Sequence, residues 1–276
     1  MPWVVGPVDM NTSSHPSTLV VGDVHQRVDA AGRVIAKYSS RCQRIVLLGD
    51  YFDSFGDGPR EMRVACQWLR RSLKDPTRTH LMGNHDLAYL LPLHEQAWCP
   101  GWTPKKQQVF DEEMSGVGIS SFRIACQVGP WLLSHAGVRG EQLDTMGSLG
   151  LLGQLEREFA SACSGNRSWL FDKGPDRGGL DSQGGILWLD WNGEFAPTAG
   201  FNQIIGHTAA NGVARAKCLT AAGAHRAFEL MSPATSFPKQ PLPQPGPEFL
   251  SVNWNLDTLQ KYAGVIDAGR LEFVVA

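Results

Sequence analysis

Five short motifs rich in aspartate and histidine constrain the fold of this chain most strongly, because each follows an apolar run or a turn. A short apolar run bounded by turn residues is typical of a buried strand, and polar residues that follow parallel strands gather at one edge of a sheet. The sequence therefore predicts one site built from five separate segments. The motifs are Gly-Asp-Val-His at residues 22–25, Gly-Asp-Tyr-Phe-Asp at 49–53, Gly-Asn-His-Asp at 83–86, Ser-His-Ala-Gly at 134–137 and Gly-His-Thr at 206–208.

The first half of the chain alternates between strand and helix patterns. Apolar residues recur at helical spacing over residues 26–39 and again after the loop at 54–59, and residues 87–97 are a mostly apolar helical stretch. Each of these segments follows a predicted strand. Three strand–helix units in series predict a largely parallel sheet that is covered by helices.

The second half reads differently. Residues 120–127 and 131–134 predict a hairpin, residues 141–163 a helix interrupted by glycines, and residues 172–185 a mobile loop beside the site. Further strands are predicted at residues 186–191, 201–205, 250–255 and 271–275. The expected fold class is α/β, with two packed sheets of mixed pairing and outer helices.

Length and composition favour one domain that spans residues 1–276, because 42% of the residues are hydrophobic. Residues 1–17 are expected to form an irregular leader, since they lack the features of a secretion signal. Six prolines fall within residues 232–247, which predicts a loop inside a longer insertion at 211–249.

Charge and cysteine usage limit the partners and the compartment. The net charge is −2, so nucleic acid is not expected as the primary partner, and no apolar stretch is long enough for a membrane helix. The six cysteines form no Cys-x-x-Cys pair, which favours reduced thiols in the cytoplasm. The sequence does not indicate an oligomeric state.

The motif residues are suited to binding divalent ions. Carboxylates and neutral imidazoles are ligands for Mn, Fe, Zn and Co, and Asp50 has two oxygens with which it could bridge two ions. Two ions roughly 3.5–4 Å apart would polarise a phosphoryl group and convert a shared water to hydroxide near neutral pH. The predicted ligands are Asp23, His25 and Asp50 for one ion, with Asn84, His135 and His207 completing the second.

His85 is expected to face the substrate rather than a metal ion. It is adjacent to Asn84, and neighbouring side chains do not take the same direction. Asp53 could accept a hydrogen bond from the His85 ring and keep the imidazole protonated, as a leaving alkoxide requires. The other histidines, His15, His80, His94 and His225, lie outside the motifs and are expected to have ordinary core or surface roles.

The order of the motifs resembles that of the calcineurin-like metallophosphoesterases over almost the whole chain. Within that superfamily the sequence is most similar to the phosphoprotein phosphatase branch, which includes bacteriophage lambda phosphatase and the diadenosine tetraphosphatases. The resemblance implies a four-layer sandwich of two mixed sheets flanked by helices. It also implies the same two ligand sets, with His85 and Asp53 as the general-acid pair.

The sequence differs from this branch at positions where the family has phosphate-binding arginines. Ser54 stands where an arginine usually follows the aspartate, and Met82 stands where an arginine often precedes Gly-Asn-His. Arg60 or Arg177 could replace the missing arginine. Trp188 could line the substrate cleft, although packing in the core would also account for it.

The resemblance and the residues together predict a bimetallic phosphatase acting on phosphomonoesters, either small molecules or phosphoserine and phosphothreonine. Mn²⁺ is the expected activating ion in vitro. Hydrolysis of nucleotide anhydrides or phosphodiesters, such as dinucleoside polyphosphates, is a second possibility. A third is a non-catalytic scaffold that binds a partner through the proline-rich segment.

Overall fold

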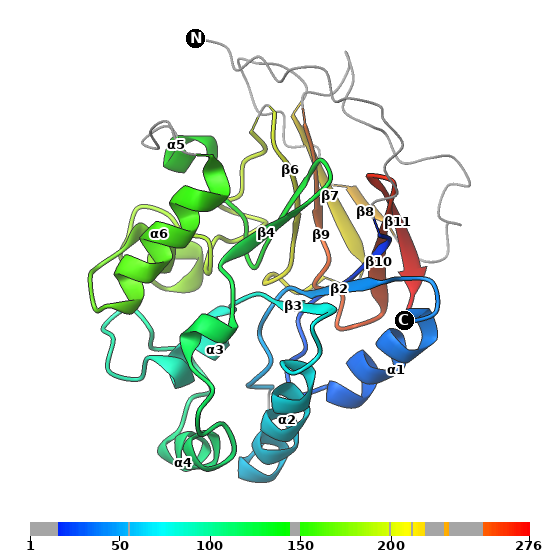
Figure 1. Cartoon of the computed structure of the whole chain (residues 1–276). Helices are drawn as coiled ribbons and strands as arrows, with labels where there is room; N and C mark the ends of the chain where they lie inside the picture. The colour runs from blue at the N-terminus through cyan, green and yellow to red at the C-terminus, as the bar shows by residue number, and fades with distance from the viewer. Residues whose placement is uncertain are drawn as a thin grey trace.

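The computed structural model describes residues 16–54, 56–143, 150–198, 200–210, 212–218, 229–231 and 251–276. Within them the strands form two sheets, one in the order β11-β10-β1-β2-β3 and one in the order β4-β5-β6-β9-β7-β8 (Figure 1). The strands are β1 (Thr18–Val21), β2 (Arg44–Leu47), β3 (Arg78–His80), β4 (Ala125–Val128), β5 (Trp131–Ser134), β6 (Asn202–Ile205), β7 (Val213–Cys218), β8 (Glu229–Met231), β9 (Ser251–Asn255), β10 (Tyr262–Asp267) and β11 (Arg270–Val275). The helices are α1 (Val28–Tyr38), α2 (Pro59–Ser72), α3 (Asn84–Leu90), α4 (Pro104–Glu113), α5 (Gly140–Leu143) and α6 (Leu151–Cys163), with 3-10 turns η1 (Ile119–Ser121), η2 (Trp169–Phe171) and η3 (Pro175–Arg177).

The first sheet contains the three strand–helix units that the sequence predicts. β1 pairs in parallel with β2, and β2 pairs in parallel with β3. On the other side of β1, the sheet continues with β10 and β11 in antiparallel pairing. The sheet is therefore mixed, and its parallel part directs the carboxyl ends of β1, β2 and β3 to the same edge.

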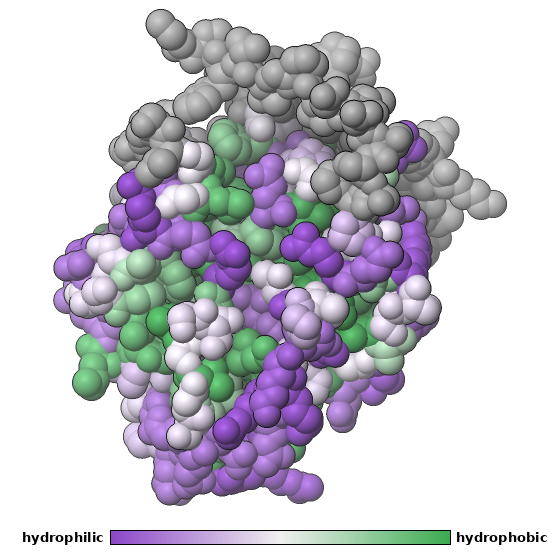
Figure 2. All heavy atoms as spheres, viewed as in Figure 1, coloured by the Kyte–Doolittle hydropathy of each residue, from purple (hydrophilic) through white to green (hydrophobic). Residues whose placement is uncertain are grey.

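Successive side chains of β1 face opposite sides of the first sheet, which explains why the sheet is packed between helices and the second sheet. Leu19 and Val21 pack in the cluster that contains the buried faces of α1 and α2, whereas Val20 packs in a second cluster with Leu133 and Trp254 of the other sheet. Because successive residues of a strand face opposite sides, β1 is covered by helices on one face and by the second sheet on the other. The outward side of α2 is hydrophilic (Figure 2). The predicted arrangement of two mixed sheets with outer helices is confirmed.

The second sheet confirms the hairpin but moves its start. β4 and β5 pair antiparallel around residues 129–130, β5, β6 and β9 are parallel, and β7 and β8 complete the sheet in antiparallel pairing. The predicted strand start at residue 120 is wrong, because residues 119–121 form the 3-10 turn η1. β7 and β8 lie within the segment that the sequence analysis treats as an insertion.

The helix predicted over residues 87–97 has different limits. α3 begins at Asn84, inside the third motif, where the Asp86 carboxylate accepts a hydrogen bond from the N–H of Gly83 at 2.9 Å. It ends at Leu90. Pro92 explains the early end, because proline has no N–H to donate and disfavours helical geometry in the residue before it.

The strand predicted over residues 186–191 is wrong. The N–H groups of Trp188 and Leu189 both donate to the carbonyl of Gly185, each at 2.9 Å, so this buried segment is a turn. A short apolar run bounded by turn residues does not distinguish a strand from another buried segment. The sequence analysis also missed α4, which begins with Thr103 accepting a hydrogen bond from the N–H of Lys106 and with Pro104 in its first turn.

Other sequence predictions fall partly outside the described residues. The leader up to residue 15, the proline-rich segment at 232–247 and the glycine-containing segment at 144–149 between α5 and α6 lie there. The loop at residues 172–185 is described and contains η3; its mobility stays a prediction. Among the residues that the structure describes, no helix has the length and apolar character that crossing a membrane requires.

His80 gives a testable pH dependence of stability. Its buried ring lies 2.8 Å from the hydroxyl of Ser72, and burial lowers the pKa of His80 to about 4 from an ordinary value of 6.5. The unfolded chain therefore binds a proton that the folded chain rejects between these values, so stability falls as pH falls below about 6.5. We expect His80 to contribute about 3 kcal/mol to this loss by pH 4, measured by urea unfolding at several pH values.

The matched variant is His80→Gln, which keeps a polar group beside Ser72 but does not titrate. The difference in unfolding free energy between the two proteins should shrink or reverse as pH falls from 7 to 4. Parallel curves for the two proteins would show that His80 is not the group responsible. The comparison cancels the contribution of every other titrating group, since both proteins share them.

Candidate metal centre

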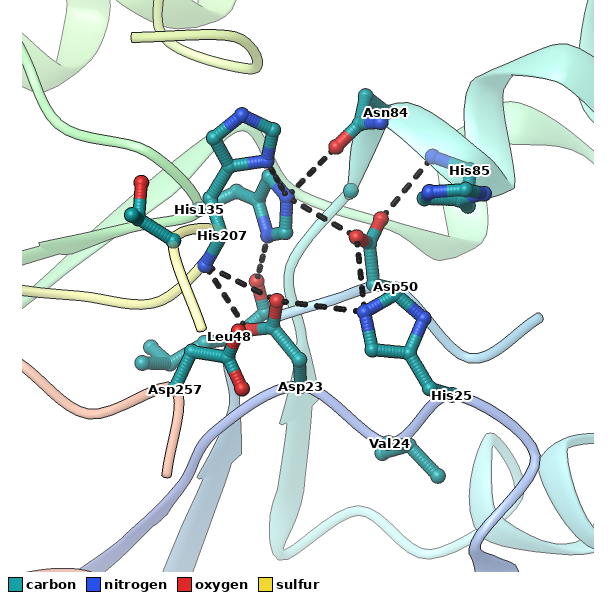
Figure 3. Close-up of polar contacts among 12 residues, drawn as sticks. Asp23, Val24, His25, Leu48, Asp50, Asn84, His85, His135, His207 and Asp257 are labelled. Atoms are coloured by element: carbon teal, nitrogen blue, oxygen red, sulfur yellow. Dashed lines mark hydrogen bonds and ion pairs between the residues drawn. The ribbon is translucent and has the colours of Figure 1, made fainter. Parts of the chain in front are cut away.

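The five motifs converge at the edge where parallel strands of both sheets end (Figure 3). Asp23 follows β1, and Asp50 follows β2. Asn84 is the first residue of α3, after β3, while His135 and His207 follow β5 and β6. The structure thus brings together all the residues that the sequence analysis proposes as metal ligands.

The first group of donor atoms contains His25 and two carboxylates. His25 Nε2 lies 3.7 Å from an oxygen of Asp23 and 3.6 Å from an oxygen of Asp50. The other ring nitrogen, Nδ1, faces the carbonyl oxygens of Phe52 at 3.2 Å and Asp53 at 2.8 Å. A carbonyl can only accept, so Nδ1 has the proton, and in the neutral ring Nε2 has the lone pair on the side of the carboxylates. This is the tautomer that binds a metal ion through Nε2.

The second group surrounds His135 Nε2. This nitrogen lies 2.9 Å from Asn84 Oδ1, 3.2 Å from His207 Nδ1 and 3.4 Å from an oxygen of Asp50. Nδ1 of the same ring is 2.9 Å from the carbonyl oxygen of Leu48, which fixes the proton there. A metal ion that displaces the proton of His135 Nε2 would therefore meet this nitrogen beside three other donor atoms.

The distances between these donor atoms fit coordination of a shared ion. Within both groups the donor–donor distances fall between 2.9 and 3.7 Å. An ion bound at about 2.1 Å in tetrahedral or octahedral geometry separates neighbouring donors by about 3.0–3.4 Å. The side chains His25, Asp50 and His85, and separately Asp50, His135 and His207, each offer ligand atoms within 4.8 Å of one another. Asp50 belongs to both clusters.

His85 and Asp53 form a pair next to the first group. His85 Nδ1 lies 3.2 Å from one oxygen of Asp53, while the second oxygen accepts hydrogen bonds from Tyr89 at 2.7 Å and from Lys106 at 2.9 Å. Burial alone would raise the pKa of Asp53, but its hydrogen bonds to His85, Lys106 and Tyr89 lower it below its ordinary value. Asp53 is therefore an anion held in place on both oxygens.

Residues 16–208, more than half of the chain, match the model of the calcineurin-like phosphoesterases. The chain belongs to the calcineurin-like phosphoesterase family. Members of this family generally use divalent metal ions to hydrolyse phosphoesters, and the donor clusters of this chain are of the kind that such ions require. Among curated proteins, no match to the sequence was found.

Solved structures include several similar folds. A metallophosphoesterase from Sphaerobacter thermophilus has a TM-score of 0.50 and 13% identity, with 94% of this chain and 88% of that chain covered. A protein serine/threonine phosphatase from Saccharomyces cerevisiae has a TM-score of 0.44 and 14% identity, covering 96% and 82%. A putative diadenosine tetraphosphatase has a TM-score of 0.41 and 14% identity, covering 95% and 94%. The first of these supports the shared fold.

The electrostatics of this phosphoesterase centre favour cations. Burial, followed by the charge of Asp257, raises the pKa of Asp23 well above its ordinary value. Burial would also raise the pKa of Asp50, yet His135 holds it well below the ordinary value. In return, Asp50 and Asp23 outweigh the effect of burial and raise the pKa of His135 to about 10. The buried carboxylates thus draw positive charge to the donor atoms, and divalent ions would supply that charge.

Two glycines let the carboxylates sit where they do. A Cβ added to Gly83 would overlap Oδ1 of Asp50, and one added to Gly206 would overlap Oδ1 of Asp23. The backbone of Asp50 and of His207 has positive φ, at 50° and 69°, a conformation that L-residues seldom adopt. Strain of this kind occurs at functional sites, where the surrounding fold maintains it.

Asp86 is a residue of the site that the sequence analysis left without a role. Its carboxylate accepts hydrogen bonds from the N–H groups of Asp50 at 2.8 Å, Tyr51 at 2.7 Å and Gly83 at 2.9 Å. It therefore ties the second motif to the third. The sequence signal was its position three residues after Gly83, the spacing of a helix capping box. Lys106 was also missed, because its contact with Asp53 joins distant parts of the chain.

The predicted substrate contacts differ in their surroundings. Arg177 donates to the hydroxyl of Thr208 at 2.6 Å and pairs with Asp190 at 2.9 Å, so its charge is already compensated. Arg60 is exposed in the first turn of α2 and has no hydrogen bond or ion pair with a site residue in the described part of the chain. Trp188 is buried with its ring 5.8 Å from that of His207. These three roles stay predictions.

Proposed function

We propose that this chain hydrolyses phosphomonoesters, small molecules or phosphoserine and phosphothreonine, at a centre of two divalent metal ions. One observation carries the proposal: Asp50 lies within ligand distance of both donor groups, so that a single carboxylate joins them. The proposed ligands are Asp23, His25 and Asp50 for the first ion, and Asp50, Asn84, His135 and His207 for the second. Mn, Fe, Zn and Co suit this mixture of oxygen and nitrogen donors.

The ions, when bound, would polarise the phosphoryl group and lower the pKa of a water that attacks phosphorus. The protein supplies the remaining steps. His85 faces Asp53 through Nδ1, which leaves Nε2 to hold a proton for the leaving group. As the bond between phosphorus and the ester oxygen breaks, that oxygen takes the proton from Nε2 and departs as an alcohol. Asp53 keeps the ring oriented and stabilises its positive charge before transfer.

The alternatives are distinguished by substrate. An anhydride or diester leaves a second substituent on phosphorus that a monoester lacks, whereas a scaffold would hydrolyse nothing. We expect kcat/KM for p-nitrophenyl phosphate to exceed that for bis(p-nitrophenyl) phosphate by at least roughly tenfold, a difference of about 1.4 kcal/mol in barrier. The measurement is a steady-state comparison with Mn²⁺, Fe²⁺, Zn²⁺, Co²⁺ and Mg²⁺ in turn, with diadenosine tetraphosphate as the anhydride.

Elemental analysis of the isolated protein accompanies the kinetic comparison and identifies the ions it retains. A preparation of the Asp50→Asn variant, purified identically, controls for contaminating phosphatases. A higher kcat/KM for the diester or the anhydride would overturn the monoester assignment in favour of that substrate. Absence of turnover with every substrate and every ion would support the scaffold instead.

A further inference from the structure

Lys173 has a fixed backbone position near the metal centre. It follows η2, and its N–H donates to a carboxylate oxygen of Asp181 at 2.9 Å. Its carbonyl in turn accepts from the N–H of Asp181 at 3.1 Å. Because both backbone groups of Lys173 are engaged by the same residue, the start of the side chain is held in one place.

Two tryptophans surround the ammonium group of Lys173. Nζ lies 4.3 Å from the ring centre of Trp188 and 5.2 Å from that of Trp98, and it donates to the carbonyl of Trp98. Trp188 also contacts His207, so the same indole touches both Lys173 and a proposed metal ligand. On the other side, the residue after Trp98 is Cys99, whose sulfur accepts a hydrogen bond from the Asn84 amide at 3.2 Å.

The charge of Lys173 lacks a carboxylate partner. No Asp or Glu of the described residues lies within ion-pair distance of Nζ, whereas Arg177 in the same loop pairs with Asp190 at 2.9 Å. The side chain is half-buried, and burial lowers the pKa of Lys173 below its ordinary value. The Asp181 carboxylate acts on this charge but makes no direct ion pair with Nζ. A partly desolvated ammonium without a direct ion pair, beside a site for anionic substrates, favours an anionic ligand.

We propose that Lys173, with Trp98 and Trp188, forms a subsite that binds a second anionic group of the substrate, a carboxylate or a phosphate on the leaving-group side. This deepens the proposed phosphatase function and rests on it. The scissile phosphate would lie at the metal ligands, whereas Lys173 contacts Trp188, whose ring in turn contacts His207. Nζ is therefore positioned for a charge farther along the substrate.

Trp98 and Trp188 favour a substrate with an apolar part in addition to its distal charge. Trp98 is 63% exposed, which is unusual for so large an apolar side chain beside a polar site. An exposed indole next to an ammonium provides a flat face for an aromatic or aliphatic group and a cation for the charge that this group carries. The preferred substrate is thus a phosphomonoester with an apolar spacer and a distal anion.

The test compares phenyl phosphate with 4-carboxyphenyl phosphate, which differ by one distal carboxylate. In the wild-type protein the carboxylated substrate should have the higher kcat/KM. Lys173→Met should lower kcat/KM for it about tenfold, mainly through KM, because a charge-assisted hydrogen bond is lost. The same variant should change kcat/KM for phenyl phosphate less than about twofold, since that substrate has nothing for Lys173 to bind.

Two control variants isolate the local contact. Lys173→Arg keeps the charge and should retain most of the preference for 4-carboxyphenyl phosphate. Lys74→Met removes an exposed positive charge at the end of α2 and should leave kcat/KM unchanged for both substrates. An equal loss on both substrates, or no loss on either, would overturn the subsite while leaving the phosphatase function in place. Failure of the wild-type protein to hydrolyse either substrate would overturn both proposals.

Discussion

Asp50→Asn is expected to lower kcat/KM for p-nitrophenyl phosphate by at least about 10³-fold, equivalent to roughly 4 kcal/mol of barrier. The carboxylate of Asp50 lies near His25 in one donor group and near His135 in the other, so its charge would serve both proposed ions. Asparagine keeps the shape of the side chain but has one oxygen and no charge. Elemental analysis should therefore show that the variant retains less than the full complement of metal.

The matched control is Asp29→Asn, which removes an exposed carboxylate from the first turn of α1. Its metal content and its kcat/KM for p-nitrophenyl phosphate should equal those of the wild-type protein. Both variants should have far-ultraviolet circular dichroism spectra like the wild type, which separates loss of ligand from loss of fold. An Asp50→Asn protein with a full metal complement and activity within tenfold of wild type would contradict the central role of Asp50.

The convergence of the motif residues could be predicted because most of them are marked locally. An apolar run, a glycine and a polar side chain in succession are visible without knowing the fold, and the parallel β1, β2 and β3 then direct their ends to one edge. The contacts around them could not be predicted in this way. Lys106 donates to Asp53 from a helix that the sequence analysis missed, and Lys173 reaches the site from a loop. Their positions depend on packing between distant segments.

The errors in the predicted secondary structure also arise because packing between distant segments is not visible in the sequence. Residues 186–191 are as apolar as a strand, yet they form a turn in which the N–H groups of Trp188 and Leu189 donate to Gly185 instead of to a neighbouring strand. α4 was overlooked because its buried residues, which include Lys106, give a weak apolar pattern. Thr103 and Pro104 were the better signal, since a capping threonine followed by proline is typical of a helix start. Local capping chemistry was more informative here than hydrophobic periodicity.

His85→Asn should lower kcat by about 10²- to 10⁴-fold on an alkyl phosphate such as β-glycerophosphate while leaving the metal content unchanged. The reason is that an alkoxide leaves only with a proton, and His85, oriented by Asp53 at 3.2 Å, is placed to supply it. The loss should be smaller on p-nitrophenyl phosphate, because p-nitrophenolate is a stable anion that departs without protonation. The measurement is kcat for both substrates in both proteins.

The comparison between the two substrates separates proton transfer from metal binding. His85 also lies close enough to His25 and Asp50 to serve as a ligand of the first ion. A ligand role would lower the metal content and reduce hydrolysis of both substrates by the same factor, because the attack on phosphorus would be impaired whatever leaves. Tyr89→Phe provides an intermediate case: it removes one hydrogen bond from Asp53 but keeps His85, so it should reproduce the leaving-group dependence at a smaller amplitude. A graded response of this kind would identify the Asp53–His85 pair as the source of the proton.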